Sequence, residues 1–157
     1  MKTSASPPTC IIHNLPKQYD EQGKPIAKSF VMIRDLLRDL GYKVKKFIPA
    51  WNHCGFKGYD SIEFGLEDED FKQALKLERK FHQKGHSKAQ WMSRNTDAWP
   101  YLWAAMHNDR HLLNRNRVDF KQVPNDWRVQ ANREAEADIL DAFGTIKIWP
   151  DNMINNE

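Results

Sequence analysis

Residues 55–64, Gly-Phe-Lys-Gly-Tyr-Asp-Ser-Ile-Glu-Phe, combine a glycine-rich turn with a short strand. Successive side chains of a strand point to opposite faces. Ile62 and Phe64 therefore share one face, and because both are apolar we expect that face to pack against helices. Tyr59 and Ser61 share the other face, where the tyrosine ring is expected on an open sheet surface. The stretch thus predicts a sheet that is covered by helices on one side.

The same stretch partly matches the RNA-reading strand of the RRM class, whose consensus is Lys/Arg-Gly-Phe/Tyr-Gly/Ala-Phe-Val-x-Phe/Tyr. The positions that agree in type are Lys57, Gly58, Tyr59, Ile62 and Phe64. Asp60 replaces a small residue, and Ser61 replaces the second stacking aromatic. In the companion strand motif at 10–16, Ile11 occupies an aromatic position, and His13 on the same face partly replaces it. Recognition of RNA by shape and backbone is therefore favoured over stacking of bases on the sheet.

Apolar periodicity predicts the element order β-α-β-β-α-β. The predicted strands cover residues 9–15, 42–49, 59–66 and 100–107, and the predicted helices cover residues 28–40 and 67–84. A polar loop is expected at 17–27 and a turn-rich link at 51–58. This order is the split βαβ arrangement, an RRM-like α+β sandwich in which two helices back a four-stranded antiparallel sheet.

The acidic block at 67–70 fits the start of the second helix, where free backbone N–H groups favour negative charge. We expect a disordered tail at 1–8, the RRM-like domain at 9–112, and a partly helical C-terminal extension at 113–157, with helical character over 125–144. This last helix is expected either on the sheet or on the flank of the domain.

The composition is that of a globular protein without a membrane segment. The chain has 157 residues, of which 40% are hydrophobic and 29% charged, and no apolar run approaches the roughly 18 residues that span a bilayer. Its two cysteines and the absence of an apolar signal core favour an intracellular, reduced protein of the nucleus or cytoplasm. The net charge of +3 is mildly basic. Basic residues gather before and beside the opening stretch, at Lys24, Lys28, Arg34, Arg38, Lys43, Lys45, Lys46 and Lys57.

Three groups of residues point to one known family. They are Pro49, Trp51, Asn52, Gly55, Gly58, Glu63 and Phe64; Gly85, Lys88 and Trp91; and Tyr101, Trp103 and Asp109. In this pattern residues 9–112 resemble the XS domain of plant gene-silencing proteins, of the suppressor-of-gene-silencing and involved-in-de-novo-methylation type. Leu102 departs from it, because the family often has glycine there. The resemblance implies an RRM-like fold. It also implies binding of double-stranded RNA, notably ends with 5′ overhangs, in small-RNA silencing or RNA-directed DNA methylation.

Candidate RNA-binding residues fall into three groups. Phosphate contacts are expected from Lys43, Lys46, Lys57 and Lys88, and more weakly from Arg94. Contacts to exposed bases or terminal pairs are expected from His13, Tyr59 and Trp91, and close approach of the backbone to RNA from Gly55 and Gly58. The alternatives without RNA contact stay open: the lysines can form a solvent-exposed face, and Trp91 can be a core residue. For Trp51 and Trp103 the core is the expected place.

No sequence motif indicates catalysis or a metal. GxSxG, P-loop and HExxH motifs are absent, and the adjacent His53 and Cys54 have neither triad nor zinc-ligand context. We therefore expect neither an enzyme nor a cofactor, and RNA, chiefly duplex, as the partner. A hydrolase would need a catalytic residue that the sequence does not identify. The main alternative is a protein-interaction module on an RRM-like scaffold, with silencing-pathway proteins as partners. The oligomeric state is not indicated.

Overall fold

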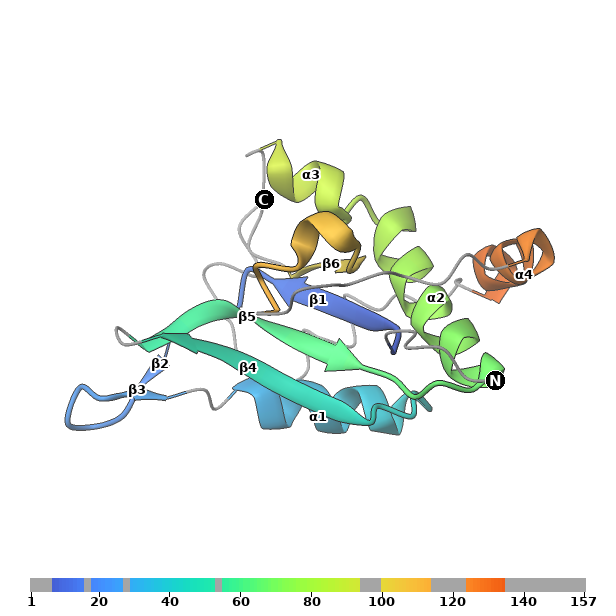
Figure 1. Cartoon of the computed structure of the whole chain (residues 1–157). Helices are drawn as coiled ribbons and strands as arrows, with labels where there is room; N and C mark the ends of the chain where they lie inside the picture. The colour runs from blue at the N-terminus through green and yellow to red at the C-terminus, as the bar shows by residue number, and fades with distance from the viewer. Residues whose placement is uncertain are drawn as a thin grey trace.

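The structure of the chain is a computed structural model that describes residues 7–15, 18–26, 29–52, 55–93, 100–113 and 124–134. Its strands are β1 (Thr9–His13), β2 (Gln18–Tyr19), β3 (Pro25–Ile26), β4 (Lys46–Asn52), β5 (Gly55–Glu63) and β6 (Tyr101–Ala104). Its helices are α1 (Ser29–Asp39), α2 (Asp68–Gln83), α3 (Lys88–Met92), the 3-10 turn η1 (His107–Asp109) and α4 (Asn125–Glu134) (Figure 1). Among the residues described, none of the helices is long and apolar enough to cross a membrane.

The main sheet has the strand order β4-β5-β1-β6, and every neighbouring pair is antiparallel. With α1 between β1 and β4 and α2 between β5 and β6, this is the predicted split βαβ arrangement, and the predicted fold class is confirmed. The polar loop expected at 17–27 contains a small hairpin, β2–β3. Asp20 stabilises its turn, because the carboxylate Oδ1 accepts the N–H groups of Gln22 and Lys24 at 3.0 and 2.8 Å.

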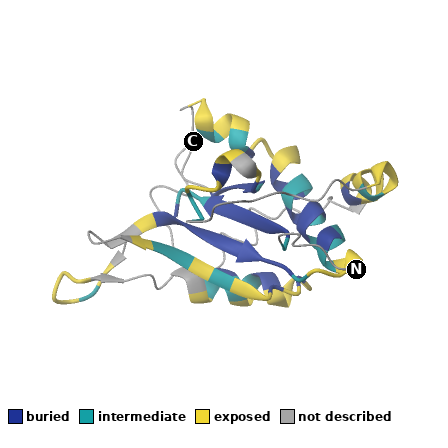
Figure 2. Ribbon diagram, in the orientation of Figure 1, coloured by how far each residue is buried: buried dark blue, intermediate teal, exposed yellow. Residues whose placement is uncertain are grey.

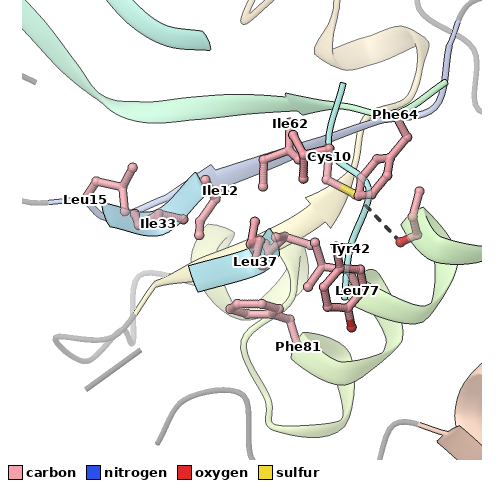
Figure 3. Close-up of a cluster of buried hydrophobic side chains, with 13 residues drawn as sticks. Cys10, Ile12, Leu15, Ile33, Leu37, Tyr42, Ile62, Phe64, Leu77 and Phe81 are labelled. Atoms are coloured by element: carbon pink, nitrogen blue, oxygen red, sulfur yellow. Dashed lines mark hydrogen bonds between the residues drawn. The ribbon is translucent and has the colours of Figure 1, made fainter. Parts of the chain in front are cut away.

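The main core lies between the sheet and helices α1 and α2 (Figure 3). Ile62 of β5 and Phe64, which directly follows this strand, are fully buried in it, as their alternation predicts. From the helices it receives, among others, Ile33, Leu37, Ala74, Leu77 and Phe81. Cys10 joins this core as a free thiol 3.8 Å from the carbonyl oxygen of Ala74, and burial raises the pKa of the thiol. Its sulfur is therefore a packing group and a weak donor.

The acidic block begins α2 as predicted. Glu67 is the N-cap residue, its carboxylate accepts the backbone N–H of Asp70, and the Asp70 carboxylate accepts the N–H of Glu67, which forms a capping box. Asp68 and Glu69 complete an acidic first turn. Negative charge here stabilises the helix, because it faces the exposed N–H groups of the first turn.

The turn-rich link predicted at 51–58 is wrong. β4 runs on through Asn52 and β5 begins at Gly55, and these two residues pair directly, so most of the predicted link is strand. Gly58 lies inside β5 with φ of +90°, a backbone conformation that residues other than glycine rarely adopt. Its carbonyl accepts the N–H of Leu15 at 3.0 Å. The glycine therefore serves a backbone contact within the fold.

The described C-terminal helix, α4, packs on the flank of the domain (Figure 1). Ala131 is buried against Leu75 of α2, with Trp127 beside them. The guanidinium of Arg79 donates to the side-chain oxygen of Asn132 at 2.9 Å, which ties the two helices together. Of the two places expected for this helix, the flank is the observed one. Residues 135–144 of the predicted helix lie outside the described part.

Candidate nucleic-acid interface

The outer face of the sheet, opposite α1 and α2, is open over only half of its width. A second cluster of buried side chains, Ile11, Tyr59, Tyr101, Trp103 and Ala105, lies on this face. Trp91 of α3 and the leucines at 112–113 pack against it and cover β1 and β6. An RRM-like sheet that reads bases would leave this surface free.

Tyr59 lies under this cover, so the expectation that its ring is on an open surface is wrong. The residue is 3% exposed. Its hydroxyl donates to the carbonyl oxygen of Leu112 at 2.7 Å, across 53 residues of chain. In this arrangement the ring packs inside the protein and is not available to stack on a base. Sequence alternation assigned the correct face to Tyr59, but not the segment that covers it.

His13 is the centre of an aromatic row on the outer face. In the strand register it lies between Tyr59 of β5 and Tyr101 of β6. Its ring centroid is 5.1 Å from that of Tyr59, 4.5 Å from Trp91 and 5.9 Å from Trp103. Burial lowers the pKa of His13 to about 4, and the backbone N–H of Asn14 donates to its Nδ1 at 2.9 Å. At neutral pH it is an uncharged ring with its proton on Nε2.

α3 places Lys88 and Trp91 above this row. The helix was not predicted, although Ser87 and Gln90 carry the spacing of a capping box and do form one. Lys88 Nζ lies 2.8 Å from Oδ1 of Asp109, whose carboxylate is 3% exposed. The other oxygen of Asp109 accepts the N–H of Met106 at 3.0 Å. The charge of Lys88 is therefore balanced by a buried carboxylate that also holds the turn after β6.

These side chains surround a cavity of about 340 Å³, which we call the aromatic pocket. It is lined by His13, Lys88, Trp91, Met92, Trp103, Asn108, Asp109, His111 and Leu112. Trp103 is buried, as expected for a core residue, and its indole N–H has no hydrogen-bond partner in the described part of the chain. A buried donor without a partner is uncommon in proteins.

The other half of the outer face is hollowed where β4, which is intermediate to exposed, meets the buried β5. The cavity there, which we call the open hollow, measures about 490 Å³. It is lined by Ile48, Pro49, Ala50, Trp51, Lys57, Tyr59, Ser61, His111, Leu112 and Leu113. Figure 2 shows β4 as intermediate and exposed beside the buried β5. This is the part of the sheet that a large ligand can reach.

Trp51 is exposed at the open hollow, so the expectation that it is a core residue is wrong. It is 46% exposed, and Ile48 on the same strand is 45% exposed. The physical reason is that β4 is an edge strand without a cover on this face in the described part of the chain, and its register with β5 shifts between Pro49 and Trp51. A register shift re-aims the side chains beyond it. Sequence periodicity does not reveal such an irregularity.

Two of the predicted lysines belong to this surface. Lys57 is exposed, lines the open hollow and holds Nζ 5.4 Å from the ring centroid of Tyr59. Lys46 is exposed and pairs in register with Glu63, two residues along β4 from Ile48. Both lysines can therefore place an ammonium group near a phosphate that crosses β4 and β5.

The remaining candidates are placed elsewhere. Lys43 is exposed in the link before β4, and its backbone N–H bonds to the side chain of Gln73 on α2, on the helix side of the sheet. Gly55 is at the hairpin end of β5, and Gly58 is buried within the strand. Arg94 lies outside the described residues. The structure therefore brings Lys57 to the hollow, places Lys46 on β4, which forms part of its wall, and brings His13, Lys88 and Trp91 to the pocket.

The described residues offer no cluster of metal ligands. They contain no group of three or more His, Cys, Asp or Glu side chains that could hold a metal ion. The adjacent His53 and Cys54 lie outside these residues.

One buried acid stands out, because both carboxylate oxygens of Asp60 lack a hydrogen-bond partner in the described chain. Burial raises the pKa of Asp60 to about 8.

The contact between Tyr59 and Leu112 can be tested by removing one atom. Tyr59→Phe deletes the hydroxyl and leaves the Leu112 carbonyl without this donor. We expect the free energy of unfolding to fall by about 1 kcal/mol, the usual net value of such a bond. Urea denaturation measures this change, and Tyr19→Phe, at an exposed tyrosine, is the control. Equal losses in both variants would contradict a closed cover over Tyr59.

Comparison with known proteins gives a consistent family match. The family model described as the XS domain matches residues 2–112. Three similar proteins of Arabidopsis thaliana are Factor of DNA methylation 3, 25% identical over 66% of this chain; Protein INVOLVED IN DE NOVO 2, 24% identical over 63%; and Factor of DNA methylation 4, 27% identical over 80%. The matches cover only 16%, 16% and 17% of these relatives' own lengths. The chain thus spans about one sixth of the curated proteins it resembles.

Proposed function

The chain belongs to the XS domain family, and from this premise we propose that it binds double-stranded RNA without catalysis, with a preference for ends that carry a 5′ overhang. Its place would be in small-RNA silencing or RNA-directed DNA methylation, inside the cell, in the nucleus or cytoplasm. The names of two relatives, Factor of DNA methylation 3 and Factor of DNA methylation 4, support a role in DNA methylation. Proteins of the same pathway are proposed as further partners.

The observation that carries this proposal is the open hollow. An exposed tryptophan, Trp51, lies there beside Lys57, and Lys46 flanks the same face. Stacking of a base on an aromatic ring contributes roughly 1–3 kcal/mol, and lysines gain affinity by releasing counterions from the phosphate backbone. Because the other half of the face is covered, contacts on this sheet are limited to β4 and β5. Such a narrow surface fits a backbone or a terminal pair better than a row of splayed bases.

A titration series tests the proposal. Blunt duplex, 5′-overhang duplex, 3′-overhang duplex and single-stranded RNA are titrated by fluorescence anisotropy at two salt concentrations. We expect the 5′-overhang duplex to bind most tightly and affinity to fall steeply with salt. Lys57→Glu is expected to weaken the binding of all duplexes about three- to tenfold, because one phosphate contact is lost and replaced by repulsion. The slope of log affinity against log salt concentration should become shallower by about 1.

The matched control is Lys72→Glu, a reversal of the same size on α2, where Nζ lies over the ring of Trp127 on the flank. It should bind RNA as wild type does. Dissociation constants weaker than about 100 μM for every RNA at physiological salt would reduce the proposal to non-specific binding. If Lys57→Glu and Trp51→Ala both bind like Lys72→Glu, the site is not on β4 and β5.

A protein-interaction module on the same scaffold is the second candidate. The observation that favours it is a pair of exposed methionines, Met92 at the end of α3 and Met106 after β6, which are 61% and 49% exposed. Methionine is common on adaptable binding surfaces because its side chain is flexible and polarizable. The titration separates the candidates, since an interaction module would show no preference among the four RNAs.

A further inference from the structure

We propose that the aromatic pocket takes one unpaired nucleobase from the end of an RNA whose backbone lies over the open hollow. The inference rests on the proposed function and deepens it, because it assigns the base of an overhang to particular residues. It concerns the base itself rather than the charge or the length of the overhang.

The lining of the pocket suits a flat aromatic ligand. Rings of His13, Trp91 and Trp103 form much of it, and its volume of about 340 Å³ falls within the roughly 300–1,000 Å³ of small-molecule sites. Trp91 is only partly buried and belongs to α3, a helix of five residues whose side chains are not buried. A base can therefore reach this ring from solvent and stack on it without opening the main core.

The polar groups of the pocket also fit a base edge. Asn108 and His111 line the pocket with exposed polar side chains, and His13 carries a proton on Nε2 because its Nδ1 accepts from Asn14. Nucleobases carry ring nitrogens, carbonyl oxygens and amino groups that can bond to such side chains. An apolar occupant would make none of these bonds.

The charges at the aromatic pocket favour recognition of a base over recognition of a phosphate. Lys88 is already paired with Asp109 at 2.8 Å, so little free positive charge is left at the pocket. The same lysine holds Nζ 6.0 Å from the ring centroid of Trp103, so a cation is already beside that ring. A second cation, such as a methylated lysine of a peptide, would therefore find this ring already occupied by a cation. A neutral base stacks on an aromatic ring without needing that position.

The pocket is placed to receive the end of an RNA bound at the open hollow. His111 and Leu112 line both cavities, so the two share a wall. A strand that passes the exposed Lys57 and crosses Leu112 would reach the pocket within a short distance of the duplex end. His111 is exposed on this path. The pocket would thus select an unpaired nucleotide that continues from a bound duplex.

The experiment compares three duplexes that differ at one end only: blunt, with a one-nucleotide 5′ overhang, and with the same overhang carrying an abasic residue. The abasic overhang keeps the phosphate and removes the base. We expect wild type to bind the base-bearing overhang at least fivefold more tightly than the other two, which should bind alike. A single stacked base contributes roughly 1–3 kcal/mol, and 1 kcal/mol is about fivefold.

Trp91→Ala should lose this preference, so that it binds the base-bearing and the abasic overhang alike, and Trp91→Phe should restore part of it. Trp127→Ala, the same substitution on the flank of α2, is the control and should keep the preference. Thermal denaturation of each variant checks the fold. A 2-aminopurine base in the overhang gives a readout on wild type alone, because stacking quenches its fluorescence.

The outcomes separate the two proposals. If wild type binds none of the RNAs above the non-specific level, the proposed function itself fails. If it binds duplex RNA but the abasic overhang is as good as the base-bearing one, the pocket inference is overturned and the function stands. Unquenched 2-aminopurine, or an unchanged preference in a folded Trp91→Ala, also overturns it. Binding of a methyl-lysine peptide with loss on Trp91→Ala would assign the pocket to a protein ligand instead.

Discussion

Asp60→Asn is expected to be less stable than wild type near pH 4 and more stable than wild type near pH 8. Asp60 is fully buried on the helix-facing side of β5, opposite Ile12 of β1 and Pro49 of β4. Neither carboxylate oxygen has a hydrogen-bond partner in the described chain. Burial therefore penalises the charged form and raises the pKa of Asp60 from 3.8 to about 8.

The direction of the pH effect follows from proton binding in the two states. Below about pH 4 the carboxyl of Asp60 is protonated in both the folded and the unfolded chain, so it does not change the free energy of unfolding with pH. Between pH 4 and 8 the folded chain keeps this proton while the unfolded chain has lost it, and the stability of wild type falls as pH rises. One pKa unit corresponds to about 1.4 kcal/mol, so the rise from 3.8 to about 8 amounts to a total change on the order of 6 kcal/mol.

Asparagine does not titrate, so the variant lacks this loss. Its buried amide adds donors without partners, which costs about 1–3 kcal/mol at every pH and makes the variant the weaker protein at pH 4. Urea denaturation of both proteins at several pH values measures the difference. Only the difference in the free energy of unfolding between wild type and Asp60→Asn is informative, because other groups such as His13 also titrate in this range in both proteins. A difference that does not change with pH would contradict a carboxyl buried without a partner.

Sequence patterning predicted the fold because the fold depends on short-range periodicity. Ile62 and Phe64 alternate with Ser61, and this alternation alone placed them on the helix-packed face. The acidic start of α2 was equally readable, since a capping box is complete within four residues. Ser87 and Gln90 carry the same signal for α3, but a helix of five residues is too short to show the apolar periodicity that would indicate it.

The candidate site was less predictable because it depends on contacts between distant segments. Tyr59 was assigned to the correct face, but its cover comes from Leu112, 53 residues later in the chain. Trp51 and Trp103 looked alike in the sequence and both lie on edge strands, but Trp51 follows a register shift in β4, whereas the face of β6 that carries Trp103 is covered by α3. Edge position and cover are properties of the assembled sheet, so local patterns do not contain them.

The ion pair between Lys88 and Asp109 provides the second large expected effect. Asp109→Ala should lower the free energy of unfolding by about 3 kcal/mol, because it removes a charge-assisted bond to Lys88 and leaves the N–H of Met106 without its acceptor. Asp109→Asn should lose about half as much, since the amide oxygen can still accept from Met106. Lys88 is 32% exposed, so its ammonium can turn to water, which keeps the loss below that of a fully buried pair.

A double-mutant cycle with Lys88→Met and Asp109→Asn measures the pair itself by urea denaturation. We expect the combined loss to be smaller than the sum of the single losses by about 1 kcal/mol or more, because the second change removes a charge that the first left unpaired. Strict additivity would contradict a direct interaction. The pair joins α3 to the turn that carries His111 and Leu112, and both elements form walls of the aromatic pocket. Each single variant should therefore also weaken the preference for a base-bearing overhang, even where blunt duplex binding is unchanged.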